Sequence, residues 1–184
     1  MTDEITAQSE AARFAWPVTL ALATVGGSLA AACMMPFVAL AIVTAATMHR
    51  SLALATILAI WATNQVLGFT VLGYPHTGYA FAWGGALGIA SVLAMLAGAA
   101  VMGERDELSS FRTLSAFLIG FFVYEAALFG LALVVGGTET FAMPIVGQIF
   151  ANDALWFAGL SGGYWLLTRT VPTLFGPAPR IRFA

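Results

Sequence analysis

The stretch WATNQVLGFTVLGYPHTGYAFAWGGALG, residues 61–88, joins the end of one apolar segment to the start of the next. It carries Asn64 and Gln65 side by side within sequence that is otherwise apolar enough for a membrane. Polar amides in lipid need hydrogen-bond partners, because the hydrocarbon offers none. The pair therefore indicates a cavity inside a bundle of helices.

The composition of the 184 residues is that of an integral membrane protein. Hydrophobic residues make up 60% and charged residues 9% of the chain, and the mean hydropathy is +0.91. This length has room for about six spans of roughly 20 residues and for almost no soluble domain. The chain has a net charge of -2 and no lysine, so a nucleic-acid partner is excluded. One cysteine and two histidines provide neither an internal disulfide nor a histidine metal site, and no cofactor is expected.

The alternation of apolar runs and polar breaks predicts an all-α integral membrane protein, a compact bundle of six transmembrane helices. The uncharged residues 14–48 would rise about 52 Å as a single helix, too far for a core of roughly 30 Å, so the chain is expected to reverse just before Pro36. The expected spans are 14–32, 36–48, 51–72, 79–102, 113–135 and 142–167. We expect a solvated cytoplasmic leader at 1–13, a single transmembrane domain at 14–168 and a basic cytoplasmic tail at 169–184.

The arginines all fall on one side of the six predicted spans, the side that also holds both termini. They are Arg13, Arg50, Arg105, Arg112, Arg169, Arg180 and Arg182. With five spans, they would be divided between the two sides. The positive-inside rule then places both termini in the cytoplasm and the chain in the inner membrane.

Six polar side chains from three predicted spans share one depth, between the outer surface and the membrane midplane. They are Asn64, Gln65, Glu125, Gln148, Asn152 and Asp153. On the last span, a stripe at helical spacing is expected to face the interior. The stripe consists of Gln148, Asn152, Trp156, Gly159 and Gly163. Together with Trp61, Trp83 and Trp156, the six polar residues form the predicted ligand-binding set.

Two interpretations of the polar layer are open. Amide side chains often only tie helices together, with hydrogen bonds worth about 0.6 kcal/mol each. An ionised carboxyl group at depth, however, costs about 2.5 kcal/mol or more unless it meets water, a partner or a proton. No arginine or lysine lies in a predicted span to pair with Glu125 or Asp153. The two carboxylates therefore favour a cavity for a ligand or ion, with donors such as Tyr124.

Other motifs indicate packing more than chemistry. Ala23, Gly27 and Ala31 are small residues spaced by four, which allow close approach of another helix. The sulfur atoms at residues 33–35 are soft enough for a metal, but such side chains also pack well in membranes, and no metal site is predicted. The sequence has no phosphate loop, nucleophile motif or paired-histidine motif, so we do not expect an enzyme.

The stretches MPFVALAIVTAATMHRSLALATILAIWATNQVLGF, residues 35–69, and AFAWGGALG, residues 80–88, resemble the S component of energy-coupling-factor vitamin transporters. The resemblance implies six helices, cytoplasmic termini and an outward-side cavity for a vitamin or a metal-containing cofactor. It also implies that Ala23, Gly27 and Ala31 dock on a transmembrane coupling subunit, which works with ATPases. No signature identifies a biotin, thiamin, riboflavin or folate subtype, and the amino-terminal metal-binding histidine of nickel and cobalt members is missing.

We therefore expect the membrane-embedded, substrate-binding component of a small-molecule uptake transporter, in contact with lipid. The first alternative is a small accessory or assembly subunit of a larger membrane complex, in which small-residue faces contact protein partners. The second is a proton-coupled carrier that uses Glu125 and Asp153.

Overall fold

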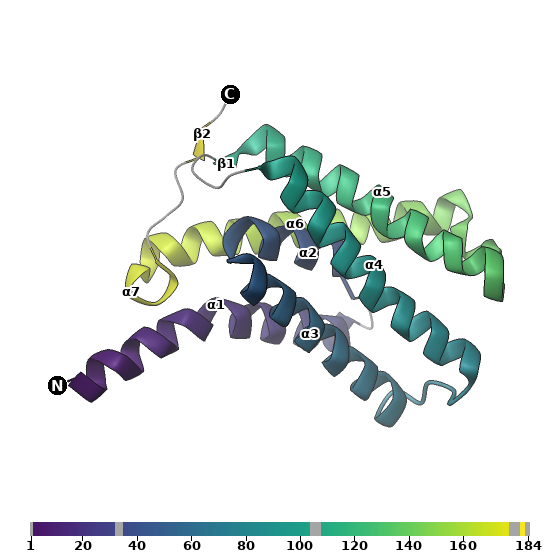
Figure 1. Cartoon of the computed structure of the whole chain (residues 1–184), viewed down its shortest axis with the longest axis horizontal. Coiled ribbons are helices and arrows are strands. Elements are labelled where there is room, and N and C mark those ends of the chain that lie inside the picture. The colour runs from purple at the N-terminus through teal and green to yellow at the C-terminus, as the bar shows by residue number, and fades with distance from the viewer. Residues whose placement is uncertain (1, 32–34, 104–107, 177–180, 183–184) are drawn as a thin grey trace.

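The computed structural model describes residues 2–31, 35–103, 108–176 and 181–182, and helices account for nearly all of them (Figure 1). The elements are α1 (Thr2–Ala31), α2 (Phe37–Thr47), α3 (Arg50–Thr70), α4 (Gly78–Met102), β1 (Leu108–Ser109), α5 (Ser110–Val135), the 3-10 helix η1 (Thr138–Phe141), α6 (Met143–Thr170), α7 (Pro172–Phe175) and β2 (Ile181–Arg182). The two-residue strands pair in parallel. The helical fold class expected from the sequence is confirmed.

Three of the described helices are long and apolar enough to cross a membrane, namely α3, α4 and α5, and α2 is a shorter apolar helix. Their outer faces carry large apolar side chains that no other part of the chain covers. Examples are Val66, Ile89, Leu96, Phe122 and Leu133, each at least half exposed. A continuous apolar exterior suits lipid and not water. The fold is therefore that of a helical membrane protein.

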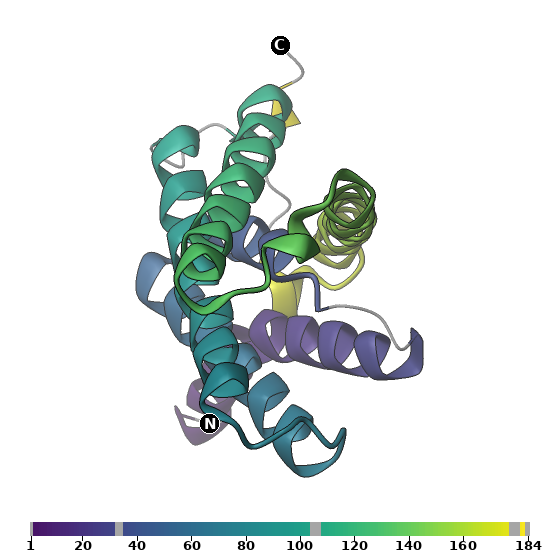
Figure 2. The same cartoon turned by 90° about the vertical axis from the view of Figure 1, so that its right-hand side faces the viewer.

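Helix α2 occupies the centre of the bundle. It packs against α3, α4, α5 and α6, and Figure 2 shows it between the α4–α5 pair and α6. Its residues 37–45 are all buried, which explains why this segment is apolar on every side. Its 11 residues give a rise of about 16 Å, roughly half of a hydrocarbon core.

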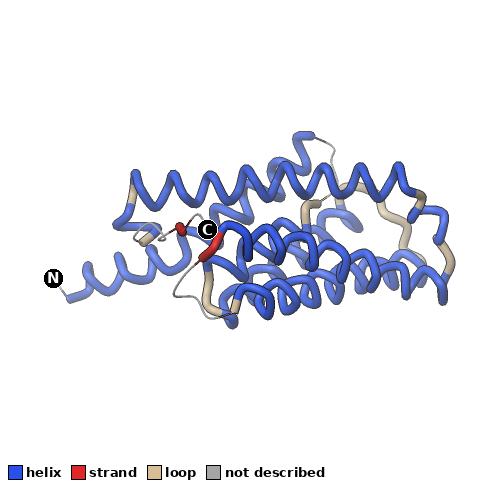
Figure 3. Tube along the Cα trace, turned by 90° about the horizontal axis from the view of Figure 1, so that it is seen from above, coloured by secondary structure: helices blue, strands red, loops and turns tan. Residues whose placement is uncertain are grey.

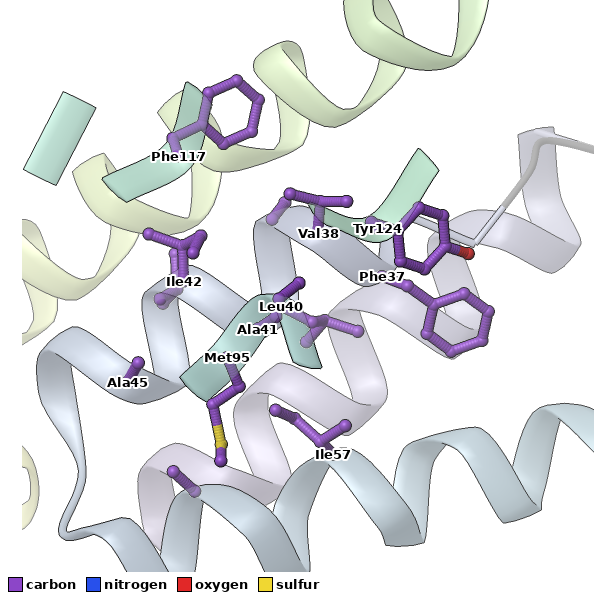
Figure 4. Close-up of a cluster of buried hydrophobic side chains, with 14 of the residues drawn as sticks. Phe37, Val38, Leu40, Ala41, Ile42, Ala45, Ile57, Met95, Phe117 and Tyr124 are labelled. Atoms are coloured by element: carbon purple, nitrogen blue, oxygen red, sulfur yellow. The ribbon is translucent and has the colours of Figure 1, made fainter. Parts of the chain in front are cut away.

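The side chain of Ile42 on α2 belongs to the buried cluster that Figure 4 shows. Glycines on α4 and α5 make room for it. A Cβ atom at Gly98 or at Gly120 would collide with the Cδ1 atom of Ile42. At Gly120 it would also reach van der Waals contact with the carbonyl oxygen of Ala94 on α4. These two glycines therefore let α4 and α5 approach each other and the core helix closely.

The turn between α3 and α4 lies at one end of the bundle together with η1, and the start of α1 lies at the opposite end with α7 (Figures 1 and 3). Helix α1 begins at Thr2, so the predicted leader at 1–13 is helical from its second residue. The predicted reversal at residues 33–35 lies outside the described residues except for Met35, and residues 104–107 of the predicted charged loop also lie outside them.

Candidate functional site

A cavity of about 440 Å³ lies toward the end of the bundle that holds the α3–α4 turn and η1. Its wall takes residues from α1, from the start of α2, from α3 to α6, and from η1. Cavities for small molecules commonly measure about 300–1,000 Å³. The volume is therefore that of a binding site for a small organic molecule.

Four of the nine predicted ligand-binding residues line this cavity, one from each of four helices. They are Asn64 on α3, Trp83 on α4, Glu125 on α5 and Asp153 on α6. These residues are far apart in the sequence, and their helices bring them to one enclosed space. The cavity thus contains both carboxylates of the predicted polar layer.

Three predicted residues make contacts between helices instead. The indole Nε1 of Trp61 donates a hydrogen bond of 2.8 Å to the carbonyl oxygen of Gly84 on α4. The side chain of Gln65 also lies against Gly84, and the ring of Trp156 lies over Gly27 of α1. Glycine at 27 and 84 leaves the space that these larger side chains fill.

The inward face of α6 differs from the predicted stripe by one residue. Gln148 is exposed, Asn152 is half-buried and Gly159 is exposed. The cavity is lined instead by Ile145, Ile149 and Asp153, which are spaced by four. One residue corresponds to about 100° of helix rotation, so the 3.6-residue period identified a stripe without identifying which stripe turns inward.

The carboxylate of Asp153 binds the amino terminus of α2. Its Oδ1 atom accepts a hydrogen bond of 2.8 Å from the backbone amide of Ala39, and the amide of Val38 donates to the same carboxylate. Pro36, at the N-cap of α2, supplies no side-chain cap. A helix start has unpaired amides and a partial positive charge, both of which favour an anion. Asp153 therefore finds its partner in helix α2 in place of an arginine.

Glu125 has no such partner within the described structure. Its side chain is nine-tenths buried, and its Oε1 atom is completely covered without a hydrogen bond. The indole Nε1 of Trp83, also on the cavity wall, is covered and without a partner as well. Buried polar atoms nearly always have a partner, so an unpaired acceptor and an unpaired donor on two residues that line one cavity favour this cavity as a place for a polar ligand.

Aromatic residues that sequence analysis missed line the cavity at the end of the bundle with the α3–α4 turn and η1. Tyr74 lies in the α3–α4 turn and packs its ring on Gly68. Phe141 of η1 stacks with Trp83, with their ring centroids 6.5 Å apart. Both line the cavity. The sequence shows aromatic residues in turns, but only the fold shows that these turns cover a common space.

The predicted docking residues of α1 have different surroundings. Ala23 and Gly27 are half-buried, Gly27 is covered by Trp156, and the side chain of Ala31 lies outside the described residues. The exposed apolar row of this helix consists of Phe14, Val18 and Leu22. Of the predicted sulfur group at residues 33–35, Met35 lines the cavity, and residues 33 and 34 are outside the described part of the chain.

A second cavity, of about 250 Å³, lies between α2, α5 and α6 toward the opposite end of the bundle. None of the covered, unpaired polar atoms found in the described residues lies in its wall. The described residues also contain no group of three His, Cys, Asp or Glu side chains that could hold a metal ion. The larger cavity is therefore the candidate functional site.

Comparison of the chain with protein family models, curated proteins and solved structures gives no match. The chemistry of the cavity is therefore the basis for inferring function. Its wall has the size to hold a small molecule, and two of its residues carry covered, unpaired polar atoms, a donor on Trp83 and an acceptor on Glu125.

Proposed function

We propose that this protein is the membrane-embedded, substrate-binding component of a small-molecule uptake transporter. One observation carries the proposal: Glu125 and Trp83 both line the same 440 Å³ cavity, and each has a covered side-chain polar atom without a hydrogen-bond partner. A ligand that pairs with both atoms would remove two unsatisfied polar groups from the interior. The proposed ligand is a vitamin or a metal-containing cofactor, in line with the resemblance of residues 35–69 and 80–88 to energy-coupling-factor S components.

In this proposal, six helices cross the inner membrane, with both termini in the cytoplasm and the cavity facing outward. The one-sided arginines support this orientation. The cavity lies at the end of the bundle with the α3–α4 turn and η1. Neither of these two connections contains an arginine. No chemical conversion of the ligand is part of the proposal.

The protein would work with a transmembrane coupling subunit and its ATPases, and α1 would provide the contact. Phe14, Val18 and Leu22 form an apolar row on α1, with exposed fractions of 49%, 53% and 71%. This row is available to a partner helix or to lipid. Ala23 and Gly27 flank it on the half-buried side of the helix.

Different parts of the cavity wall would have different roles in ligand binding. Asp153 fixes the start of α2 through the amide of Ala39, which gives the cavity a rigid floor. Tyr74 and Phe141 come from short connections that can shift with less disruption of packing than the helices. A ligand can therefore enter past these two residues and meet Trp83 and Glu125 inside.

Native mass spectrometry of the protein, purified in mild detergent, tests this function. We expect a stoichiometric small-molecule adduct. Trp83→Phe keeps an aromatic ring but removes the indole N–H, and it should reduce the retained adduct about tenfold, since an unpaired ligand group costs about 1–3 kcal/mol. The control is Trp165→Phe, because Trp165 is more than a third exposed and lies outside this cavity.

Two amide positions provide a second matched comparison. Asn64 lines the cavity and Gln148 is exposed, although both belong to the same predicted polar layer. Asn64→Ala should weaken ligand retention, and Gln148→Ala should leave it unchanged. Equal retention by both variants and by the Trp83→Phe protein would contradict a ligand-binding role for the cavity.

An accessory or assembly subunit is the alternative function, favoured by the exposed apolar row on α1. It predicts a reproducible protein partner and no small-molecule adduct in the same mass spectra. In that case, Leu22→Ser should release the partner, since Leu22 is the most exposed residue of the row.

A further inference from the structure

We infer that the ligand is an organic cation with a hydrogen-bond acceptor, held by Glu125 as counter-ion within an aromatic wall. This inference deepens the proposed function and rests on it. It concerns the chemical class of the ligand, which the cavity's charges, rings and unpaired atoms define together.

The charge of the cavity comes from its carboxylates. Among the described residues that line it, none is arginine, lysine or histidine, whereas Glu125 and Asp153 are both acidic. The chain also has no lysine anywhere in its sequence. An anionic ligand would therefore meet only like charges here.

The two carboxylates are not equivalent. Asp153 accepts hydrogen bonds from the amides of Ala39 and Val38, and the positive end of the α2 dipole offsets part of its charge. Glu125 has one completely covered oxygen with no hydrogen bond. The uncompensated acceptor of the cavity is thus Glu125, and a cationic group on the ligand supplies the partner that it lacks.

The remaining wall suits a cation that is organic and weakly hydrated. Five lining residues are aromatic: Phe37, Tyr74, Trp83, Tyr124 and Phe141. Aromatic faces attract ammonium and similar cations through the ring quadrupole, and aromatic cages are a common binding site for quaternary ammonium groups. A small inorganic cation would need several oxygen ligands, and the described lining residues provide no cluster that could hold a metal ion.

Trp83 adds a requirement for a second group on the ligand. Its covered, unpaired Nε1–H is a donor only and cannot pair with an ammonium group. The ligand therefore carries an oxygen or nitrogen acceptor besides its cationic centre. With this pair of groups, one molecule carries a hydrogen-bonding partner for each of the two residues, Glu125 and Trp83.

Three water-soluble aromatic probes of different charge test the class on the purified protein in detergent. They are benzyltrimethylammonium, benzyl alcohol and benzenesulfonate, with dissociation constants measured by equilibrium dialysis. We expect the cation to bind more tightly than the other two by about tenfold or more. This ranking needs no variant, so it decides the inference even if a substituted protein fails to fold.

Glu125→Gln keeps the shape of the side chain and removes its charge. It should weaken benzyltrimethylammonium about tenfold and should change benzyl alcohol little. The matched control is Glu139→Gln, which removes the same charge from an exposed residue of η1 at the same end of the bundle. This control should bind all three probes like the parental protein.

The outcomes separate this inference from the proposed function. The inference is wrong if the sulfonate or the alcohol binds best. It is also wrong if the Glu125→Gln and Glu139→Gln proteins bind the cation equally. In both cases the cavity remains a binding site, but its ligand is not a cation paired with Glu125. If no probe binds and the native protein also carries no adduct, both the inference and the proposed function are wrong. Loss of cation binding in Glu125→Gln alone, with the cation preferred in the parental protein, supports both.

Discussion

At the scale of single residues, the two buried carboxylates differ in their hydrogen-bond partners. Asp153 is 1% exposed and bound to the amides at the start of α2, whereas Glu125 is 9% exposed with an oxygen that has no partner. A carboxylate that caps a helix contributes to stability, and one that is left unpaired destabilises the fold unless something binds it. We therefore assign Asp153 to folding and Glu125 to ligand binding.

Asp153→Ala should lower the free energy of unfolding by about 1–3 kcal/mol, because the amides of Val38 and Ala39 would lose their partner in the interior. Asp153→Asn keeps a side-chain oxygen that can accept from Ala39 and should lose less. Chemical denaturation in detergent micelles measures both. Parental stability in the alanine variant would show that the cap contributes nothing.

Gly68 supports the cavity from outside its wall. A Cβ atom there would collide with the ring of Tyr74, while Gly85 has nothing within 4 Å of its own Cβ position. Gly68→Ala should displace Tyr74 and speed the release of the bound molecule. Gly85→Ala should leave release unchanged and add up to about 1 kcal/mol of helix stability. Release rates that are equal in both variants would show that Tyr74 does not close the cavity.

At the scale of elements, the bundle is organised around α2, a helix too short to span the membrane alone. Its packing depends on two glycines that face one atom, since both Gly98 of α4 and Gly120 of α5 lie against the Cδ1 of Ile42. Close-packed interiors tolerate added methyl groups poorly, because neighbouring side chains must leave their preferred rotamers. The contact between α2, α4 and α5 is therefore sensitive to a single carbon atom.

Gly98→Ala should destabilise the fold by about 1–3 kcal/mol. Ile42→Val removes the Cδ1 atom, so the double variant should regain much of this loss, which a double-mutant cycle on thermal unfolding would measure. Gly130→Ala is the control, because no atom lies within 4 Å of its Cβ position. Strictly additive effects of the two substitutions would mean that Ile42 and Gly98 are not coupled.

At the scale of the whole molecule, the apolar exterior and the positions of the arginines support the proposed orientation of the bundle in a membrane. Arg50 begins α3 and Arg169 lies in the last turn of α6, so both belong to the end opposite the cavity. Arg169 also covers the ring of Trp165, with its guanidinium carbon 4.0 Å from the ring centroid. Such aromatic and cationic pairs suit a boundary between lipid and water.

A reporter fused after residue 184, or inserted at Asp106, should read cytoplasmic, and one inserted at Thr138 should read external. The reason is that short loops rich in arginine stay in the cytoplasm. Alkaline phosphatase and green fluorescent protein, which are active on opposite sides of the inner membrane, provide the two readings. An external reading at Asp106 would overturn the six-span topology.

The helical class and the membrane environment follow from sequence alone, because an apolar run of span length leaves few alternatives. The shortness of α2 was also predictable, since Pro36 and His49 bound it closely. In the same way, Asn64, Glu125 and Asp153 could be selected as interior residues, because polar groups in apolar helices need partners.

Only the tertiary structure decided which of these side chains share a cavity. A shift of one position along α6 turns Gln148 outward and Asp153 inward, and helix rotation depends on packing with α2 and not on the period of the sequence. The sequence also could not identify the partner of Asp153, because this partner is a backbone amide 114 residues away. Backbone amides look identical in every sequence, so only the fold could show that the start of α2 meets this carboxylate and leaves Glu125 unpaired.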